Sequence, residues 1–151
     1  MVPREDARIR LAFPELGDAE LDEVRGVLAS GALTMGPKVE EFEGLVAAAC
    51  GVEHAVAVSN GTAALHLAVL ALGIGAGDEV IVPAYTFPAT ANVVRLAGAT
   101  PVLVDVDPAT FNLDVGKVYE AVTPRTKAVL AVHLFGRPLD WTALQSAVDP
   151  G

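Results

Sequence analysis

Short runs of apolar residues alternate with segments of helical spacing from residue 55 to the end of the chain. Within each run the apolar residues are almost continuous, which indicates parallel strands buried on both faces. The predicted strands are AVAV at 55–58, EVIVP at 79–83, TPVLVDV at 100–106 and KAVLAVHLF at 127–135. The predicted helices between and after them cover residues 62–72, 88–97, 115–122 and 141–148. This order predicts an α/β fold, a mostly parallel sheet with flanking helices and right-handed crossovers.

The first 54 residues follow a different pattern, with two helical segments and no apolar run. Asp18 is placed to cap a helix that ends at Ser30, and Pro37 suits the first position of a second helix that Gly51 closes. Two prolines, at positions 3 and 14, discourage a helix before the first of these segments. Residues 1–16 are therefore predicted to form an extended or irregular arm.

The stretch from Ala55 to Gly77 carries the first chemical signal. A predicted strand passes through Ser59-Asn60-Gly61 into a helix rich in alanine and leucine. The first amides of such a helix have no partner within it and lie at the positive end of its dipole, so they form a ready anion site. The sequence alone leaves open the alternative that this is an ordinary βα turn that binds nothing.

Glycine-rich signals elsewhere do not add a nucleotide motif. The glycines at 73, 75 and 77 follow a predicted helix and precede a strand, which is the reverse of the order in the dinucleotide-binding fingerprint. They are interpreted as a helix stop and a connecting turn. The chain also lacks the Gly-Lys-Ser/Thr pattern of a phosphate loop.

Composition excludes several classes of partner. The chain has 151 residues and is 52% apolar, enough for a buried core, and its net charge is −9. Lys and Arg number 10 against 19 acidic residues, which argues against a nucleic-acid surface. The uncharged stretch at 55–77 is broken too often to span a membrane. With no apolar signal segment at the start, we expect a cytoplasmic protein.

Candidate polar residues are few, and several have plain structural interpretations. Cys50 is the single cysteine, so no intramolecular disulfide is expected, and it is predicted to be a small buried residue. His54, His66 and His133 lack metal-ligand spacing, and no metal site is predicted. Asp105 and Asp107 lie at a strand end, where acidic residues often only cap turns. His133 lies near the C-terminal end of a predicted strand and Phe87 in the loop after another, at the ends of the strands where parallel sheets bind ligands.

Five motifs, in this order and spacing, resemble the DegT/StrS family of PLP-dependent aminotransferases, which act mostly on keto sugars attached to nucleotides. The motifs are LTMGPKVEEFE at 33–43, VSNGTAAL at 58–65, GDEVIVP at 77–83, TFPATAN at 86–92 and VHLFG at 132–136. Each motif alone is modest, but together they extend over nearly the whole chain. The resemblance implies the large domain of the aspartate-aminotransferase fold (PLP fold type I), with pyridoxal 5′-phosphate at the interface of a homodimer.

The resemblance also assigns residues. Gly61, Thr62 and Ala63 match the turn that holds the cofactor phosphate, and Phe87 matches the aromatic residue that stacks on the pyridine ring. Thr34 and Lys38 lie in a segment near the active site and the subunit contact, and His133 is a further possible pocket residue. The implied division is an arm, helix and loop over residues 1–36 and a partial PLP-binding large domain over 37–151.

Two residues that the family uses for catalysis have no counterpart here. In the family, a lysine that binds the cofactor and an aspartate that pairs with the pyridinium nitrogen lie beyond the HLFG-type strand. Lys38, Lys117 and Lys127 are the only lysines, and none stands in that motif. We therefore expect an N-terminal, truncated portion of an enzyme that transfers an amino group from a donor such as glutamate to a nucleotide-linked keto sugar, inactive alone. The alternatives are a non-catalytic, phosphate-binding partner of a full-length relative, or part of a related sugar dehydratase or cysteine-handling lyase.

Overall fold

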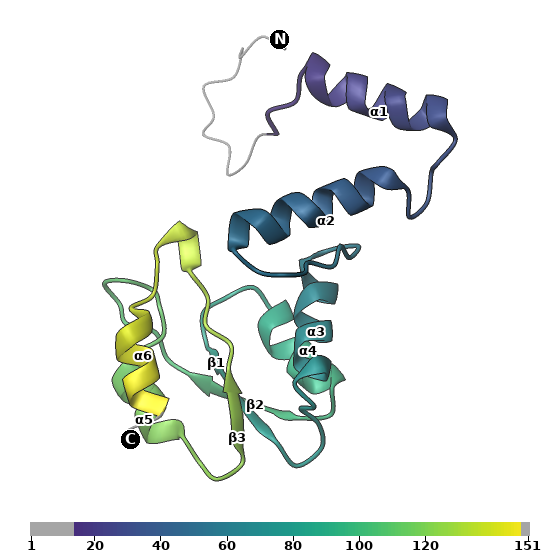
Figure 1. Cartoon of the computed structure of the whole chain (residues 1–151). Helices are drawn as coiled ribbons and strands as arrows, with labels where there is room; N and C mark the ends of the chain where they lie inside the picture. The colour runs from purple at the N-terminus through teal and green to yellow at the C-terminus, as the bar shows by residue number, and fades with distance from the viewer. Residues whose placement is uncertain (1–13, 149–151) are drawn as a thin grey trace. The chain divides into compact units, whose positions relative to one another are not determined.

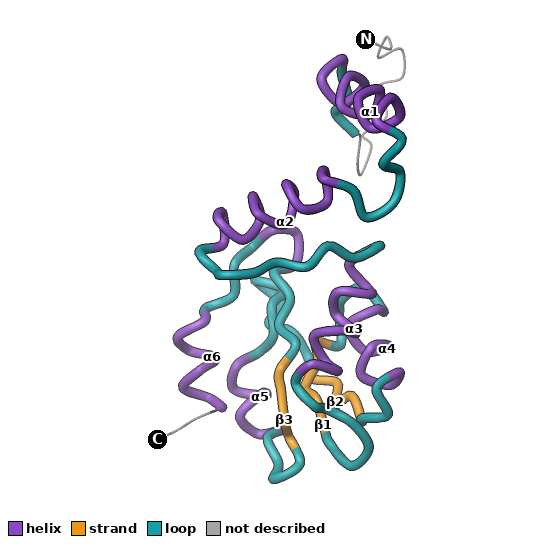
Figure 2. The backbone as a smooth tube through the Cα atoms, turned by 45° about the vertical axis from the view of Figure 1, so that its right-hand side comes forward, coloured by secondary structure: helices purple, strands orange, loops and turns teal. Residues whose placement is uncertain are grey.

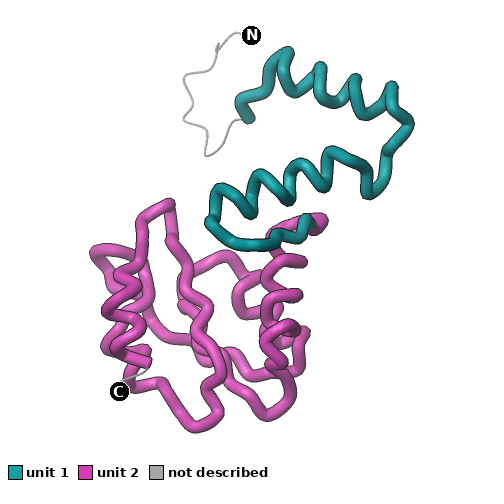
Figure 3. The backbone as a smooth tube through the Cα atoms, viewed as in Figure 1, with its two compact units in different colours: residues 1–57 teal, residues 58–151 magenta. Residues whose placement is uncertain are grey.

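The computed structural model describes residues 14–148, so most of the predicted N-terminal arm lies outside the described residues (Figure 1, Figure 2). The chain divides into two compact units, Met1–Ala57 and Val58–Gly151 (Figure 3). The sequence predicts a different division, between an N-terminal part at residues 1–36 and a partial PLP-binding domain at 37–151. That division stays a prediction.

The first unit contains the two predicted helices. Helix α1 covers Asp18–Ser30 and helix α2 covers Pro37–Cys50. Pro37 occupies the first turn of α2 as predicted, and Gly51 ends that helix in the left-handed region at φ 66°. One detail is wrong: Asp18 is the first helical residue, and Gly17 precedes it as the cap. The Glu20 carboxylate accepts a hydrogen bond from the Gly17 amide at 2.6 Å, so a residue of the first turn satisfies the amide of the cap residue.

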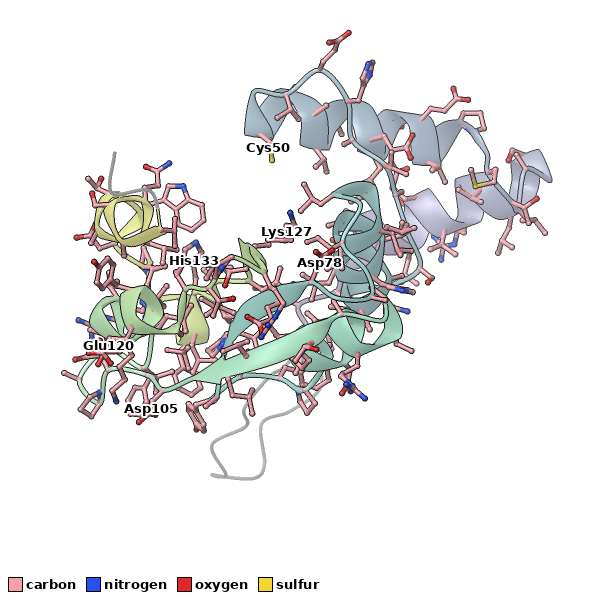
Figure 4. The ribbon with its side chains drawn as sticks, turned by 90° about the horizontal axis from the view of Figure 1, so that it is seen from below. Cys50, Asp78, Asp105, Glu120, Lys127 and His133 are labelled. Carbon is pink, nitrogen blue, oxygen red and sulfur yellow. The ribbon has the colours of Figure 1, made fainter. Side chains whose placement is uncertain are left out.

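The first unit has little core of its own among its described residues. Helix α1 buries no residue, and α2 buries only Ala47. Cys50 is exposed at the end of α2, so the prediction that it is buried is wrong (Figure 4). No core surrounds the last turn of that helix, and its small apolar residues therefore stay accessible.

The second unit is a three-layer α/β structure. Its sheet has the order β2-β1-β3, with all pairs parallel, which confirms the predicted parallel α/β arrangement. The strands are β1 (Glu79–Pro83), β2 (Thr100–Val104) and β3 (Thr126–Val129). The helices are α3 (Gly61–Ala71), α4 (Ala89–Leu96), α5 (Val115–Ala121), α6 (Trp141–Val148) and the short 3₁₀ helix η1 (Leu134–Gly136). Helices α3 and α4 cover one face of the sheet, and α5 and α6 cover the other (Figure 1, Figure 2).

The central strand divides the core into two clusters. Val80 and Val82 pack with α3 and α4, whereas Ile81 points to the opposite face and packs with α5 and α6. All five residues of β1 are buried, as predicted for a strand covered on both faces. The two edge strands are partly exposed instead, and Leu103 of β2 retains 64% of its accessible surface.

Three predicted strands differ in extent from the observed ones. Residues 55–58 are not a strand: the Ala57 amide donates to a Glu43 carboxylate oxygen at 2.7 Å instead of to a neighbouring strand. Strand β2 ends at Val104, because the chain turns back so that Val106 bridges antiparallel to Leu113. Strand β3 ends at Val129, six residues before the predicted end.

The early end of β3 has a specific cause in β1. The Leu130 amide donates to the Ile81 carbonyl oxygen at 2.9 Å, which is the last bond of this ladder. In a parallel pair the next donor to the Leu130 carbonyl would be the amide of Pro83, and proline has no N–H. The ladder therefore stops there, and the chain continues without strand pairing into η1.

An ion pair and a hydrogen bond join the first residue of β1 to the loop before β3, at the amino-terminal end of the strands. Glu79 is buried, with 8% of its surface accessible. Its carboxylate accepts hydrogen bonds from the Thr123 hydroxyl at 2.6 Å and from the Arg125 guanidinium at 3.0 Å. The Thr123 hydrogen bond first, and the hydrogen bond and charge of Arg125 next, lower the pKa of Glu79.

This lowered pKa predicts a pH-dependent contribution to stability. Because the carboxylate is favoured in the folded chain, its stabilisation is present above the unfolded pKa of about 4.3 and is lost as the pH falls through the folded value. The variant Glu79→Gln should therefore be less stable than the original chain near pH 6, and the difference should shrink as the pH approaches about 3. Chemical denaturation at a series of pH values measures it. Asp105 and Asp107 also have lowered pKa values, but both proteins contain them, so their effect cancels. A difference that does not change with pH would contradict the assignment.

Candidate functional site

The predicted anion site lies at the first turn of α3. Asn60 is the cap residue in extended conformation, and its side-chain oxygen accepts a hydrogen bond from the Ala63 amide at 2.9 Å. The Ala64 amide donates to the Asn60 carbonyl oxygen at 3.1 Å, as the first bond of the helix. Within residues 14–148, the amides of Gly61 and Thr62 have no acceptor. Two of the three amides assigned to this turn are thus available to an anion, and the amide of Ala63 is committed to Asn60.

The cap itself gives a measurable prediction. Replacing Asn60 with alanine removes the acceptor for the Ala63 amide and should lower the free energy of unfolding by about 1 kcal/mol. Ser59→Ala is the matched control, because Ser59 only accepts a 3.2 Å hydrogen bond from the Asn60 amide group at the surface. Thermal or urea unfolding of the two variants provides the comparison. Equal losses in both would show that the side chain of Asn60 does not cap α3.

Phe87 lies at the same edge of the sheet as this turn. It follows the carboxyl end of β1, just before α4, and 72% of its surface is accessible. Helices α3 and α4 lie side by side, and both begin at the edge where the parallel strands end (Figure 1, Figure 2). The loop is held by a hydrogen bond from the Thr90 amide to the Phe87 carbonyl oxygen at 3.2 Å. An exposed aromatic ring therefore lies at the edge that carries the free amides.

Lys38 and Thr34 belong to the first unit. The Lys38 ammonium group forms ion pairs with Glu23 of α1 at 2.7 Å and with Glu41 at 2.8 Å. These two partners raise the pKa of Lys38, so its amine is held protonated and is a poor nucleophile. Thr34 is an exposed residue of the loop between the two helices. The role of both residues at a subunit contact stays a prediction.

The remaining polar candidates lie in strand-end loops of the second unit (Figure 4). His133 is exposed, and its Nδ1 accepts a hydrogen bond from the Leu139 amide at 3.0 Å, so Nε2 is the nitrogen that remains available. Asp105 accepts a hydrogen bond from the Val106 amide and pairs with Lys117 at 3.2 Å. Asp107 accepts hydrogen bonds from the amides of a tight turn, including Thr110 at 2.8 Å. The Val106 amide and then Lys117 lower the pKa of Asp105, and the side chain and then the amide of Thr110 lower the pKa of Asp107. Each aspartate thus has a turn-capping role.

Sequence reasoning missed an aromatic cluster at the same edge. Tyr85 and Phe111 come from two different loops and Phe135 from η1, and their rings meet around Phe111. The sequence does place an aromatic residue after each of the three strands, which was the available signal. Their meeting depends on loop geometry that no local pattern specifies.

No group of three or more His, Cys, Asp or Glu side chains within residues 14–148 is arranged to hold a metal ion. In the same part of the chain, no helix has the length and apolar character needed to cross a membrane.

A family model matches most of the chain. The model describes the DegT/DnrJ/EryC1/StrS aminotransferase family, and the match covers residues 14–149. It confirms the resemblance carried by the five motifs.

Curated relatives and solved structures agree with this match. GDP-perosamine synthase of Caulobacter vibrioides is 52% identical over 134 residues, which is 88% of this chain and 36% of that protein. Spore coat polysaccharide biosynthesis protein SpsC of Bacillus subtilis is 49% identical over 144 residues, 95% of this chain and 37% of that protein. The putative sugar aminotransferase Spr1654 from Streptococcus pneumoniae, in its PMP form, superposes with a TM-score of 0.88 at 38% identity, covering 92% of this chain and 35% of that one.

These comparisons confirm the predicted fold class, the PLP fold type I of sugar aminotransferases. The chain spans little more than a third of the length of these curated relatives.

Proposed function

Since the chain belongs to the DegT/DnrJ/EryC1/StrS aminotransferase family, we propose that it supplies the cofactor-phosphate and ring-stacking part of a PLP-dependent sugar aminotransferase. The observation that carries the proposal is the pair of free amides, Gly61 and Thr62, at the first turn of an 11-residue helix. Amides and helix dipole together favour a phosphate group at this point.

The residues of this chain fit part of pyridoxal 5′-phosphate. Gly61 and Thr62 would bind the phosphate through their amides, with Ala63 completing the turn. Phe87 would cover the pyridine ring with its exposed aromatic face. When bound, the cofactor supplies an electron sink for the transfer of an amino group. In the family, the cofactor lysine and the aspartate lie beyond the HLFG-type strand. None of Lys38, Lys117 and Lys127 stands in the motif of that lysine, so this chain would not transfer amino groups alone.

The substrate class follows from the family resemblance and from the names of the relatives. GDP-perosamine synthase and the sugar aminotransferase Spr1654 support an amino-sugar product. We infer that the complete enzyme transfers an amino group from a donor such as glutamate to a nucleotide-linked keto sugar, and that it works as a homodimer in the cytoplasm. Thr34, Lys38 and His133 are the residues we place near its pocket or subunit contact.

The phosphate part of the proposal can be tested on this chain directly. Pyridoxamine 5′-phosphate is the suitable probe, because it has no aldehyde to react with exposed lysines. We expect it to bind the chain, as measured by its fluorescence, and expect pyridoxamine, which has no phosphate, to bind much more weakly. Equal binding of the two compounds would show that α3 does not hold a phosphate.

A second candidate function rests on the apolar side chains that α1 and α2 leave exposed. Within the described residues, Val24, Leu28 and Phe42 each keep more than half of their surface accessible, at 57%, 63% and 57%. Such a surface favours a non-catalytic partner that binds a full-length relative. Co-expression with a full-length family member and co-purification would support this function, and separate elution of the two proteins would exclude it.

A further inference from the structure

Three exposed aromatic side chains form a cluster at the carboxyl edge of the sheet. The ring centroids of Tyr85 and Phe111 are 5.9 Å apart, and those of Phe111 and Phe135 are 6.1 Å apart in an edge-to-face arrangement. Their accessible fractions are 53%, 44% and 79% in chain order, so the rings contact each other while their outer surfaces face solvent. We call these three residues the aromatic platform.

The two segments that carry Phe111 and Phe135 are joined by hydrogen bonds in both directions. The side-chain amide of Asn112, which is 4% exposed, donates to the carbonyl oxygens of Arg137 at 3.2 Å and Pro138 at 3.0 Å. In return, the Arg137 guanidinium donates to the Ala109 carbonyl oxygen at 2.9 Å. The segments that carry Phe111 and Phe135 are therefore joined by side-chain hydrogen bonds as well as by the contact of their rings.

Both phenylalanines have an unfavourable backbone conformation. Phe111 has φ 60° and Phe135 has φ 55°, in the left-handed region that bulky residues rarely adopt. Strain of this kind persists where the surrounding structure imposes it, and it gathers at ligand sites. Burial accounts for little of it at Phe135, which keeps 79% of its surface accessible, whereas Phe111 keeps 44%.

We propose that the aromatic platform binds the nucleobase of the nucleotide-linked substrate, an inference that rests on the proposed function. The platform lies where parallel sheets bind ligands, and it offers ring surface to a flat, partly polar group. A nucleobase fits it better than a subunit does, since three rings cover far less than the roughly 800 Å² that each partner contributes to a stable interface. The charged side chains of Asp105 and Arg137 lie in the same segments and are exposed, so they are accessible to the polar edge of a base.

The test uses the whole chain with uridine 5′-diphosphate and guanosine 5′-diphosphate as probes. Proton NMR should show upfield shifts of the base protons on binding, caused by the aromatic rings. Phe135→Leu keeps the apolar bulk but removes the ring, and should weaken binding by about 5- to 100-fold. Phe111→Leu should act in the same direction. Tyr119→Leu is the matched control, because Tyr119 is an aromatic residue of α5 that is 61% exposed and lies outside the platform, and it should change nothing.

Each alternative outcome overturns the inference. Unchanged binding in Phe135→Leu and Phe111→Leu, or complete competition by pyrophosphate without any base-proton shift, would place the nucleotide elsewhere. A change in sedimentation of these variants, with base binding intact, would make the platform a subunit contact. Pyridoxamine 5′-phosphate binding in the same samples reports on α3 separately, so that failure of the platform and failure of the proposed function are distinguishable.

Discussion

Replacing Gly61 with proline is expected to weaken the binding of pyridoxamine 5′-phosphate by about 10- to 100-fold. The substitution removes one of the two free amides, and a hydrogen bond to a charged group contributes about 1.5–3 kcal/mol. Proline is tolerated at the first position of a helix, and Asn60 before it already has the extended backbone that a following proline requires. Helix α3 should therefore form as before, and the loss should appear in binding alone.

Gly61→Ala is the control for this experiment. A Cβ atom at position 61 meets nothing within 4 Å, and alanine keeps the amide. We expect this variant to bind the phosphate compound as the original chain does. If Gly61→Ala and Gly61→Pro lose affinity equally, the amide of residue 61 is not a phosphate ligand. Circular dichroism of the variants checks that α3 is intact.

Replacing Ile81 with alanine is expected to lower the free energy of unfolding by about 2–5 kcal/mol. Ile81 is fully buried at the centre of β1 and packs against Val118 of α5 and Leu144 of α6. Truncation removes apolar contacts and leaves a cavity, because the strand backbone is fixed by parallel neighbours on both sides. Denaturation in urea, with a constant slope, measures the change.

Leu103→Ala tests whether this loss depends on burial. Leu103 lies in the adjacent strand but remains 64% exposed, so its truncation should cost less than about 0.5 kcal/mol. A similar loss for both variants would mean that α5 and α6 do not form the core described for that face of the sheet.

The helices and the central strand were predictable because their signals are local. Strand β1 matches its prediction at both ends, and α5 begins directly after Asp114, whose carboxylate accepts hydrogen bonds from two helix amides. An apolar run ended by proline and a cap residue ahead of a helix both act within a few residues. For these elements the sequence contains the whole physical cause.

The strand ends and the exposed residues depended on distant parts of the chain. Residues 55–58 have the composition of a strand, but a strand needs a partner, and Ala57 bonds to Glu43 instead. The apolar run of β3 continues to residue 132, although its ladder ends at Val129. Cys50 has a small-residue context typical of a core, yet its surroundings are open. Strand pairing and burial depend on residues that are distant in the sequence, so the local sequence pattern does not determine them.

The candidate site shows the same division. The turn at Gly61 and Thr62 was predictable from the break at Ser59-Asn60-Gly61 before a helical segment, although the strand predicted ahead of it is not formed. The engagement of Ala63 was not, because Asn60 can cap a helix or face solvent and the sequence does not say which. The aromatic platform was equally out of reach, since Tyr85 and Phe135 are separated by 50 positions along the chain and meet only through Phe111.

The missing amide hydrogen of Pro83 has a consequence for the shape of this edge. Strand β1 leads through α4 to β2 on one side, whereas β3 lies on the other side, so the topological switch point of the sheet falls between β1 and β3. Open α/β sheets receive ligands in the crevice at such a point. Pro83 has no amide N–H that would lose a hydrogen-bond partner if the two strands separated. Strands β1 and β3 can therefore diverge at this point without leaving a buried amide of β1 unpaired. One proline thus permits the sheet to open at the place where its topology calls for a binding crevice.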